Sequence, residues 1–331
     1  MRKVLVTGGA GFIGSHLVDK LVSQKFQVAV IDDLSGGQIK NCNKAARFFK
    51  ADIRNFKRID AIMAEFKPEI VYHLAANAAE NKAQFSPVDI TSRNFDGAIK
   101  VLTAAIRHGM KRFIFTSSIA VYGQLQTPFK EQDTPDPEDL YGVSKLAFEH
   151  SLKILSKVHN FEYVITRPHN IYGPRQNMRD PYRNVVTIFM NALLQKKPYY
   201  IYGNGKQRRC FSYIDDVCQA LYLCATKKVA GMTFNIGSDK DYTVNELSDK
   251  ILKIAGSKLK PNFLPARPQE VKIAISDHAL CKKYLDYKES VSLEEGLIRT
   301  WEWVKKQGYK KPEYTKIEID SPLLPKNWRK G

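Results

Sequence analysis

A tyrosine and a lysine four residues apart, Tyr141 and Lys145, are the strongest chemical signal in the sequence. At that spacing both side chains would lie on one face of a helix. A phenol ordinarily titrates at about pH 10 and is a poor base at neutral pH. A neighbouring ammonium, together with a cationic ring in the same site, would favour the phenolate and lower the pKa of the phenol. The pair could therefore remove a proton from a substrate hydroxyl.

Three hydroxyl residues, Thr116, Ser117 and Ser118, stand upstream of this pair at the end of a predicted buried strand. In open α/β folds ligands bind at the carboxyl ends of the strands. A hydroxyl at that edge could bridge a substrate oxygen and the phenol. A Tyr-x-x-x-Lys match alone usually marks a solvated helix face. The chemical interpretation therefore depends on finding the pair together with these strand-end hydroxyls.

A glycine-rich turn lies near the amino terminus. Gly8, Gly11 and Gly14 stand three residues apart, between an apolar strand ending at Thr7 and a helical pattern beginning at Phe12. Glycines there allow a tight turn, a bare backbone beside a pyrophosphate, and close packing of helix on strand. The amino terminus of the helix would face the phosphates with free N–H groups. The pattern predicts a dinucleotide site.

An acidic residue, Asp32, ends the next predicted strand about 20 residues further on. A carboxylate there accepts hydrogen bonds from the adenosine ribose hydroxyls and repels a 2′-phosphate. Asp33 and Leu34 follow, so no arginine stands ready for that phosphate. Asp52, with Ile53, could hold the adenine edge. We therefore expect NAD rather than NADP.

Short apolar runs alternate with helical patterns through the first half of the chain. Continuous apolar runs such as 70–75 are typical of strands buried on both faces. The alternation predicts an α/β protein with a right-handed, doubly wound parallel sheet of the Rossmann type. The predicted strands are Val4–Thr7, Gln27–Asp32, Arg47–Asp52, Ile70–Ala75, Arg112–Ser117 and Tyr163–Arg167, and the predicted helices are Phe12–Ser23, Phe56–Phe66 and Asn94–His108.

The pattern loosens in the second half, where Gly and Pro separate short elements. We expect residues 1–175 to be mainly the NAD-binding domain, with returns to the sheet near 211–240. Residues 176–331 would be mainly a smaller, discontinuous α/β lobe that binds the second ligand, with an irregular C-terminal tail. Thr243 and Ser292 each stand where a capped helix would begin, the second with the capping-box partner Glu295.

The net charge of +18 is the one unusual bulk feature. It could indicate an anionic partner, but the lysines are spread along the chain in short doublets, so we interpret it as a solvated surface and expect no nucleic-acid partner. No apolar run long enough for a transmembrane helix occurs, and no membrane partner or secretory signal is expected. The five cysteines form no metal-binding spacing, so we predict no metal site and a reducing, cytoplasmic compartment.

Eight stretches taken together resemble one superfamily. They are TGGAGFIGSH at 7–16, HLAA at 73–76, SSIAVYG at 117–123, YGVSK at 141–145, RPHNIYGPRQ at 167–176, GNGKQRRCFSYIDD at 203–216, FNIG at 234–237 and RPQEV at 267–271. They cover nearly the whole chain and resemble the extended short-chain dehydrogenases. Within these, the pattern is similar to the NAD-dependent epimerase/dehydratase family, above all UDP-glucose 4-epimerase. The set is highly specific for the superfamily and less so for the reaction.

The resemblance implies a role for each matching residue. Tyr141 is similar to the catalytic base, Lys145 to its electrostatic partner and the anchor of the cofactor ribose, and Ser118 to the hydroxyl that positions the substrate. The implied cofactor-binding residues are Gly8, Gly11, Phe12, Ile13, Gly14, Asp32, Asp33, Asp52, Ile53, Leu74, Ala75, Ala76, Asn94, Ser117, Tyr141, Lys145 and Pro168. The implied substrate-binding residues are Ser118, Tyr141, Asn170, Asn184, Val185, Arg209, Arg267 and Glu270. Arginine suits a diphosphate because its planar fork pairs with phosphate oxygens, although Arg209 and Arg267 could also form surface salt bridges.

Departures from the family pattern narrow the reaction. Family 4,6-dehydratases carry an Asp-Glu pair, and sugar-acid decarboxylases a Glu, where this chain has Ile119 and Ala120. Neither side chain can act as an acid or a base, which disfavours elimination of water and decarboxylation. Cys210, where many relatives have Asp, is expected to be a small packing residue. Ala274 falls where some epimerases place a bulky residue, which implies room for an N-acetylated hexose.

The sequence therefore predicts a nucleotide-sugar 4-epimerase that uses NAD and acts on a UDP-hexose or UDP-N-acetylhexosamine. Other redox enzymes of nucleotide sugars stay open, namely a 4-keto reductase, an epimerase at another carbon, or a 4,6-dehydratase. A non-enzymatic NAD-binding regulator or RNA-binding relative is the alternative of another class. By resemblance, we expect a homodimer formed through helices within 94–108 and 141–158.

Overall fold

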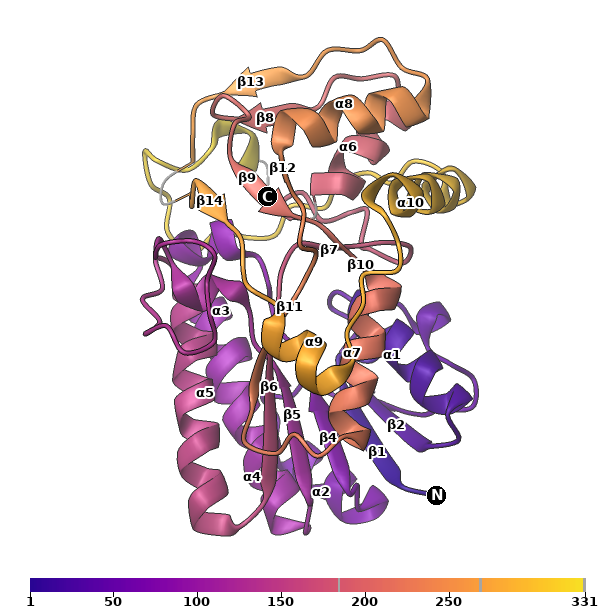
Figure 1. The fold of residues 1–331 in the computed structure, drawn as a ribbon, viewed down its shortest axis with the longest axis vertical. Helices are drawn as coiled ribbons and strands as arrows, with labels where there is room; N and C mark the ends of the chain where they lie inside the picture. The colour runs from indigo at the N-terminus through magenta and orange to yellow at the C-terminus, as the bar shows by residue number, and fades with distance from the viewer. Residues whose placement is uncertain (184, 268–269, 330–331) are drawn as a thin grey trace.

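A parallel sheet of seven strands forms the centre of the structure, a computed structural model that describes residues 1–183, 185–267 and 270–329. The strand order is β11-β6-β5-β4-β1-β2-β3, and every neighbouring pair runs parallel (Figure 1). The strands are β1 (Lys3–Thr7), β2 (Gln27–Asp32), β3 (Arg47–Lys50), β4 (Ile70–His73), β5 (Arg112–Thr116), β6 (Glu162–Pro168) and β11 (Thr233–Ile236). The order is that of a doubly wound sheet, so the predicted α/β fold class is confirmed.

Three strands end earlier than the sequence predicts. β3, β4 and β5 stop one or two residues short, at Lys50, His73 and Thr116. The residues beyond these ends leave the ladder and turn over the edge of the sheet. β1 lies between β2 and β4, with Thr7 in register with both Ile31 and His73. The strand order therefore reverses at the carboxyl end of β1, where sheets of this kind bind ligands.

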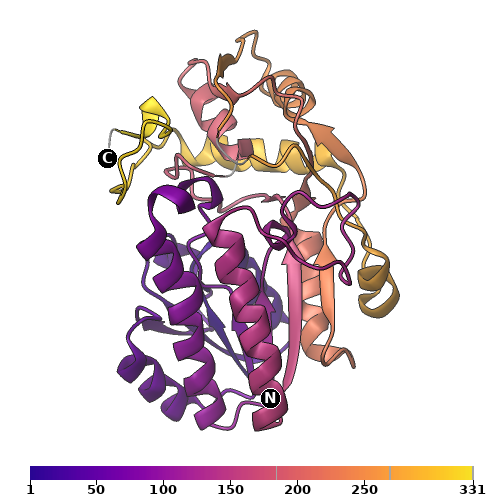
Figure 2. The same cartoon turned by 90° about the vertical axis from the view of Figure 1, so that its left-hand side faces the viewer.

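Helices cover both faces of the sheet, as Figures 1 and 2 show from two sides. One face carries α1 (Phe12–Ser23) and α7 (Ile214–Thr226), and the other carries α2 (Phe56–Phe66), α4 (Gly97–Arg107) and α5 (Leu140–His159). Along β1, Val4 and Val6 belong to the core under α1 and α7, whereas Leu5 belongs to the core under the other three helices. This alternation explains why the strands are apolar throughout.

The predicted helix over 94–108 is interrupted near its start. The chain forms α3 (Pro87–Thr91), then a π-helical turn at Ser92–Asp96 (η3), and only then α4. In this turn the Asn94 side chain points inward. Its amide donates to the backbone oxygen of Asn77 at 2.9 Å, and its oxygen accepts from the Asn77 N–H at 2.8 Å. The turn thus fixes the loop that follows β4, in keeping with the frequent occurrence of π-helical turns at functional sites.

A smaller lobe lies beyond the carboxyl edge of the sheet (Figure 1). It packs α6, α8 and α10 against one another and adds short sheets of two or three strands, whereas α9 returns to pack on β11 and α7. The bounds are β7 (Ile171–Tyr172), α6 (Val185–Leu194), β8 (Tyr200–Tyr202), β9 (Arg208–Cys210), β10 (Ser212–Tyr213), β12 (Asp241–Thr243), α8 (Val244–Ala255), β13 (Asn262–Leu264), β14 (Ile273–Ala274), α9 (Ala279–Leu285) and α10 (Leu293–Gln307).

The two predicted helix caps in this lobe are confirmed. Thr243 and Glu246 form a complete capping box at the start of α8, with the Glu246 N–H donating to the Thr243 hydroxyl at 3.1 Å. The Ser292 hydroxyl accepts the Glu295 N–H at 3.2 Å at the start of α10. The predicted capping box at Ser292 is only half formed, because the Glu295 carboxylate pairs with Arg299 instead. Both caps satisfy backbone donors that a helix start leaves without partners.

Residues 308–329 form a segment without regular helices or strands apart from the short 3-10 helix η5 (Lys326–Trp328), and we call this segment the C-terminal strap. It runs beside the loops that follow β4, as its yellow trace shows in Figure 2. Thr315 accepts a hydrogen bond from the buried Lys82 ammonium at 2.6 Å. Glu318 accepts the N–H groups of Val88 and Asp89 at 2.8 and 2.9 Å, which caps α3. The strap is therefore fastened to the large lobe.

The strap is also fastened to the small lobe. Trp328 is buried at 1% exposure in an apolar cluster with Tyr182, Phe85 and Leu324, and its ring meets the Tyr182 ring edge-on at 5.0 Å. The side-chain amide of Asn327, next to it, donates to the Tyr202 hydroxyl at 3.0 Å. One segment thus contacts both lobes, so the strap spans the opening between them.

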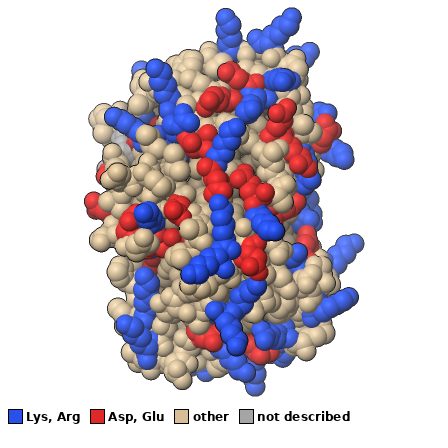
Figure 3. Space-filling model, viewed as in Figure 1, with Lys and Arg blue, Asp and Glu red and all other residues tan. Residues whose placement is uncertain are grey.

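Charged side chains of both signs are mixed on the face of the molecule that Figure 3 shows. Figure 3 shows Lys and Arg over both lobes of the visible face, interspersed with Asp and Glu rather than gathered in one stripe. This distribution agrees with the interpretation of the +18 charge as a solvated surface. Among the described residues, no helix is both long and apolar enough to cross a membrane.

Candidate active site

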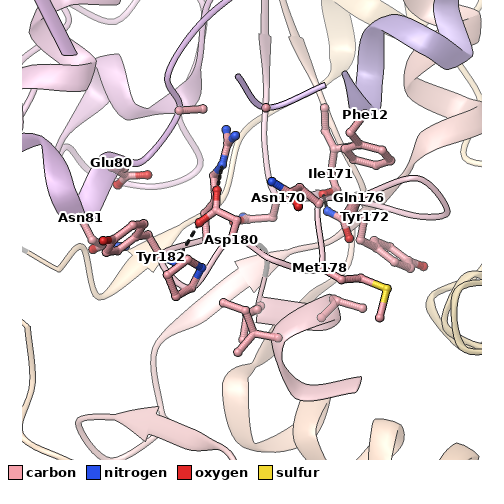
Figure 4. A pocket seen from close by; sticks show the side chains of 18 of the residues that line it. Phe12, Glu80, Asn81, Asn170, Ile171, Tyr172, Gln176, Met178, Asp180 and Tyr182 are labelled. Atoms are coloured by element: carbon pink, nitrogen blue, oxygen red, sulfur yellow. Dashed lines mark hydrogen bonds and ion pairs between the residues drawn. The ribbon is translucent and has the colours of Figure 1, made fainter. Parts of the chain in front are cut away.

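A cavity of about 890 Å³ lies between the carboxyl edge of the sheet and the small lobe. Its walls come from the glycine-rich turn, the ends of β2, β4, β5 and β6, the start of α5, several segments of the small lobe and the strap (Figure 4). Its floor is the switch point between β1 and β4. We call the side built on the strand ends the cofactor half, and the side built by the small lobe and the strap the sugar-nucleotide half.

The glycine-rich turn has no room for side chains. A Cβ on Gly14 would stand 2.1 Å from the backbone oxygen of Gly8, and a Cβ on Gly8 would stand 2.8 Å from the backbone nitrogen of Ala75. Gly8 also has a φ of +73°, a region that favours glycine. The turn leads directly into α1, whose first turn carries no acidic residue. The main chain and the amino end of α1 together fit a pyrophosphate.

Asp32 lines the cavity at the end of β2. Its carboxylate accepts the N–H groups of Ala10 and Leu34 at 3.0 and 2.8 Å, and burial raises its pKa. A Cβ on Gly37 would stand only 3.0 Å from this carboxylate. The loop is therefore folded around Asp32, which faces the space that a ribose would take.

Asp52 and Asn94 are predicted cofactor residues that do not line the cavity. The carboxylate of Asp52 is paired with Arg54 at 2.6 Å, which lowers its pKa, whereas its neighbour Ile53 does line the cavity. The Asn94 amide is occupied by the backbone of Asn77. Both side chains therefore hold the loops around the cavity instead of facing it.

The remaining predicted cofactor residues are brought together on one side of the cavity. These lining residues are Gly8, Gly11, Phe12, Ile13, Gly14, Asp32, Asp33, Ile53, Leu74, Ala75, Ala76, Ser117, Tyr141, Lys145 and Pro168. Within the described residues, the buried hydroxyls of Thr116 and Ser117 have no hydrogen-bond partner. Buried polar groups are rarely left unsatisfied, so these hydroxyls fit a ligand placed against the end of β5. The site as a whole fits a dinucleotide.

Tyr141 and Lys145 lie in the first two turns of α5, on the same side. Asp139 caps the helix by accepting the Gly142 N–H at 2.8 Å, which sets where the phenol stands. The Lys145 ammonium donates to the backbone oxygen of Thr116 at 2.8 Å and lies 5.7 Å from the centre of the Tyr141 ring. Tyr141 is 7% exposed, at the wall of the cavity.

Desolvation is strong at this pair. Burial raises the pKa of Tyr141, a hydrogen bond with Ser118 and the charge of Arg183 lower it, and the charges of Glu80 and Asp139 add to the rise. Burial also lowers the pKa of Lys145 to about 7. Desolvation therefore dominates in the protein alone, and the expected lowering of the pKa of the phenol stays a prediction for the protein with a cationic ring bound. A cationic ring placed against the phenol would favour the phenolate.

Ser118 stands at the turn between β5 and the 3-10 helix η4 (Ile119–Tyr122). Its hydroxyl accepts the Ala120 N–H at 3.1 Å and lines the cavity. Ile119 packs in an apolar cluster, and Ala120 packs beside Tyr141. No acid or base stands at these two positions, as the sequence indicates.

Two predicted arginines line the sugar-nucleotide half. Arg209, on β9, donates to the backbone oxygen of Arg208 at 2.9 Å, and burial lowers its pKa. Arg267 pairs with Glu270 at 2.8 Å and lies over the Tyr202 ring at 4.6 Å. These contacts hold both guanidinium groups at the cavity wall. Arg267 thus forms a salt bridge, the alternative that the sequence left open, but forms it at the cavity wall.

The other predicted substrate residues are distributed differently. Asn170 lines the cavity just after β6, and Val185 lines it at the start of α6. Asn184 lies outside the described residues. Cys210 is fully buried with a pKa raised to about 12 by burial, which confirms it as a packing residue. Ala274 packs against Val121, Tyr122 and Phe129 and does not line the cavity.

Several lining residues were not predicted. They are Glu80 and Asn81 from the 3-10 helix η2 (Glu80–Phe85), Asp180, Tyr182 and Arg183 from the loop before α6, Tyr200 and Tyr202 from β8, and Tyr309, Tyr314 and Asn327 from the strap. Asp180 pairs with Arg183 at 2.7 Å (Figure 4). The one sequence signal was that the segment 180–183, with a charged residue at each end, directly precedes the predicted Asn184. The others belong to no motif and are brought in by tertiary folding.

The site thus defines a dinucleotide-dependent α/β enzyme with a second, polar half for another ligand. Residues 4–237 match the NAD dependent epimerase/dehydratase family. The chain belongs to this family, whose members are enzymes, and NAD is its cofactor.

Three relatives illustrate what the chain is similar to. It is 33% identical over 310 residues to a UDP-glucose 4-epimerase of Mycolicibacterium smegmatis, covering 91% of this chain and 98% of that one. It is 31% identical over 320 residues to a UDP-N-acetyl-alpha-D-glucosaminuronate decarboxylase of Bacillus cytotoxicus, covering 91% and 97%. The solved UDP-glucose 4-epimerase of Thermotoga maritima with UDP-glucose matches at 36% identity and a TM-score of 0.87, covering 92% and 99%.

Proposed function

We propose that the protein is a nucleotide-sugar 4-epimerase that acts on a UDP-hexose or UDP-N-acetylhexosamine. One observation carries the proposal. Tyr141, Lys145 and Ser118 meet where the two halves of the cavity join, and the neighbouring positions 119 and 120 offer no second acid or base. Reversible oxidation at one carbon needs one proton acceptor, whereas elimination needs a further acid and base.

The chain's own residues have separable tasks in this reaction. The turn from Gly8 to Gly14, Asp32 and the strand-end hydroxyls would hold NAD, which when bound supplies the hydride acceptor for the sugar carbon C4. Tyr141 would accept the proton of the 4-hydroxyl and return it to the same oxygen when C4 is reduced on its other face. Ser118 would donate a hydrogen bond to that oxygen. Lys145 would stabilise the phenolate by its charge.

The sugar must turn over between the two transfers while the nucleotide stays bound. Arg209 and Arg267 supply charged hydrogen-bond donors for a diphosphate, and the Tyr202 ring beside them offers a flat apolar surface. The cavity of about 890 Å³ has to hold both the dinucleotide and the sugar nucleotide. Firm anchors on the nucleotide support epimerisation, because they let the sugar turn over without leaving the site.

We also infer a homodimer formed through α4 and α5. Val143, Ile154 and Val158 repeat at helical spacing along the outer side of α5 and are 44%, 62% and 69% exposed. An exposed apolar stripe on a long helix fits a second copy of the same stripe. Sedimentation of the wild-type protein and of Ile154→Lys tests this inference, since the substitution should yield monomers.

The test of function is a panel of UDP-, dTDP-, CDP- and GDP-sugars incubated with the purified protein, followed by sugar analysis. We expect the C4 epimer of a UDP-sugar to form with no net NADH. Tyr141→Phe should lower the rate by about a thousandfold, as loss of a general base does, while NAD binding persists. Stoichiometric consumption of NADH, a dehydrated keto sugar or a pentose would each contradict the proposal. So would a Tyr141→Phe variant that keeps full biological activity.

A further inference from the structure

Glu80 is a carboxylate in the cavity that neither the motifs nor the proposed reaction uses. It is the first residue of η2, in the loop after β4, and it lines the cavity beside Asn81 (Figure 4). Within the part of the chain that the structure describes, its carboxylate forms no hydrogen bond or ion pair. The nearby carboxylates differ, because Asp180 is paired with Arg183 and Glu270 with Arg267. Glu80 therefore keeps its acceptor oxygens for a ligand.

The backbone of Glu80 is held firmly. Ala79, before it, is 4% exposed in the apolar cluster of Trp328, and Ala83 is fully buried against Tyr141. The Lys82 N–H donates to the Ala79 oxygen at 2.9 Å, and the Lys82 ammonium is bound by Thr315 of the strap. A short helix pinned at both ends cannot carry Glu80 away from the cavity.

Glu80 lies between the chemical centre and the diphosphate anchors. Its charge raises the pKa of Tyr141 and that of Asp139 on one side. On the other side, the charge of Glu80 raises the pKa of Arg209, which burial lowers. The charges of Arg209 and Arg267 lower the pKa of Glu80, which burial raises. A sugar whose C4 reaches Tyr141 while its diphosphate reaches Arg209 lies in the cavity that Glu80 lines.

We propose that Glu80 makes the sugar pocket selective against a hexose that carries a carboxylate, so that neutral hexoses are accepted and hexuronates are rejected. The proposal rests on the proposed function and names its substrate class. Sugar hydroxyls donate hydrogen bonds to a carboxylate, whereas a uronate would oppose one anion with another in a site of low dielectric. The guanidinium of Arg183 cannot relieve this repulsion freely, because Asp180 already neutralises it.

The repulsion of a uronate would be an unfavourable contact of the kind by which related enzymes on one scaffold discriminate between substrates. The relative from Bacillus cytotoxicus is named for a substrate with a uronic acid, and it shares the fold family of this chain. Exclusion of a charged sugar would thus distinguish two members that both keep the dinucleotide site.

The test compares the NAD-loaded wild type with Glu80→Gln, Glu80→Asp and the control Glu65→Gln. Gln keeps the shape and removes the charge, Asp keeps the charge, and Glu65 lies on α2 away from the cavity. The measurements are kcat/KM and Kd for UDP-glucose and UDP-glucuronate. We expect a preference for UDP-glucose of about a hundredfold in the wild type, reduced at least about tenfold in Glu80→Gln only.

Two outcomes would overturn the proposal: equal handling of both sugars by the wild type, or an unchanged ratio in Glu80→Gln. If neither sugar is epimerised, the proposed function fails, yet the ratio of the two Kd values still decides the role of Glu80. If Glu80→Gln does not fold, as judged by its NAD content, Glu80→Ser replaces it with the same criterion. A preference that is lost in Glu80→Asp as well would point to shape rather than charge and would also reject the proposal.

Discussion

The two halves of the cavity are built in different ways. The cofactor half consists of main chain at the ends of adjacent strands, where Gly8 and Gly14 leave no space even for a methyl group. The sugar-nucleotide half consists of side chains from separate segments, such as Arg209 on β9, Tyr182 before α6 and Tyr314 on the strap. A backbone site depends on the sheet that supports it, whereas a site of side chains can change one residue at a time. The second half is therefore the place where members of the family can diverge in substrate.

The substitution with the largest expected effect disrupts the cofactor half alone. In Gly14→Ala the added methyl would stand 2.1 Å from the Gly8 oxygen, so the turn must open. We expect NAD affinity to fall by more than about a hundredfold, which corresponds to about 3 kcal/mol. NAD content of the purified protein and fluorescence titration measure this.

Gly109→Ala is the matched control for that change. Its Cβ would meet nothing within 4 Å, although its φ of +76° makes the substitution cost about 1 kcal/mol. It should lower the melting temperature slightly and leave NAD content unchanged. Equal NAD loss in the two variants would show that the turn is not a backbone site.

The substitution with the next largest expected effect disrupts the sugar-nucleotide half. Arg209→Met keeps the length of the side chain and removes its charged donors, which contribute about 2 kcal/mol to binding of an anion. We expect KM for the UDP-sugar to rise about thirtyfold, with NAD content unchanged. A loss of NAD in this variant would mean that the two halves are not separable.

A smaller effect is expected from the strap. Trp328→Ala removes a ring that is 1% exposed against Tyr182, and the strap should detach from the cavity wall while both cores stay folded. We expect KM for the UDP-sugar to rise severalfold and limited proteolysis to cut within 308–329. Global unfolding at an unchanged KM would show instead that the strap belongs to the core.

The smallest effect concerns the junction of the halves. His169 follows Pro168 of the cofactor half, and its Nε2 lies 3.1 Å from Nε2 of His278 and from the Ser276 hydroxyl. Burial lowers the pKa of both histidines, so the folded state favours their neutral forms. The stability they contribute is present above the unfolded pKa of about 6.5 and is lost as pH falls below it, by up to about 1.4 kcal/mol per pH unit for each proton.

Thermal melts between pH 7.5 and 5 measure this loss. His278→Asn, which removes one of the two rings, should flatten the dependence relative to the wild type. His159→Asn, at the exposed end of α5, is the control and should leave the slope unchanged. An equal slope in all three proteins would assign the acid sensitivity to other groups.

The sequence predicts the cofactor half of the cavity better than the sugar-nucleotide half. The glycine-rich turn and the Tyr141–Lys145 pair are each carried by a contiguous motif whose spacing has a local physical cause, so the cofactor half, the catalytic pair and the order of the sheet could be predicted. Glu80 belongs to no motif, because only the packing of η2 against α5 and the strap brings it to the cavity. The π-helical turn and the raised pKa of Tyr141 likewise depend on burial, which a linear pattern does not show.

The position of β11 late in the sequence affects how the chain folds on the ribosome. β11 pairs with β6, yet 64 residues, which include α6 and α7, separate Pro168 from Thr233. The growing sheet therefore keeps an unpaired edge along β6 until those residues have emerged, and such edges invite association with other chains. A fragment cut after the first 175 residues would retain this open edge permanently. The two lobes must therefore be made as one chain. Dividing the coding sequence at the visible boundary between the lobes would leave the β6 edge exposed.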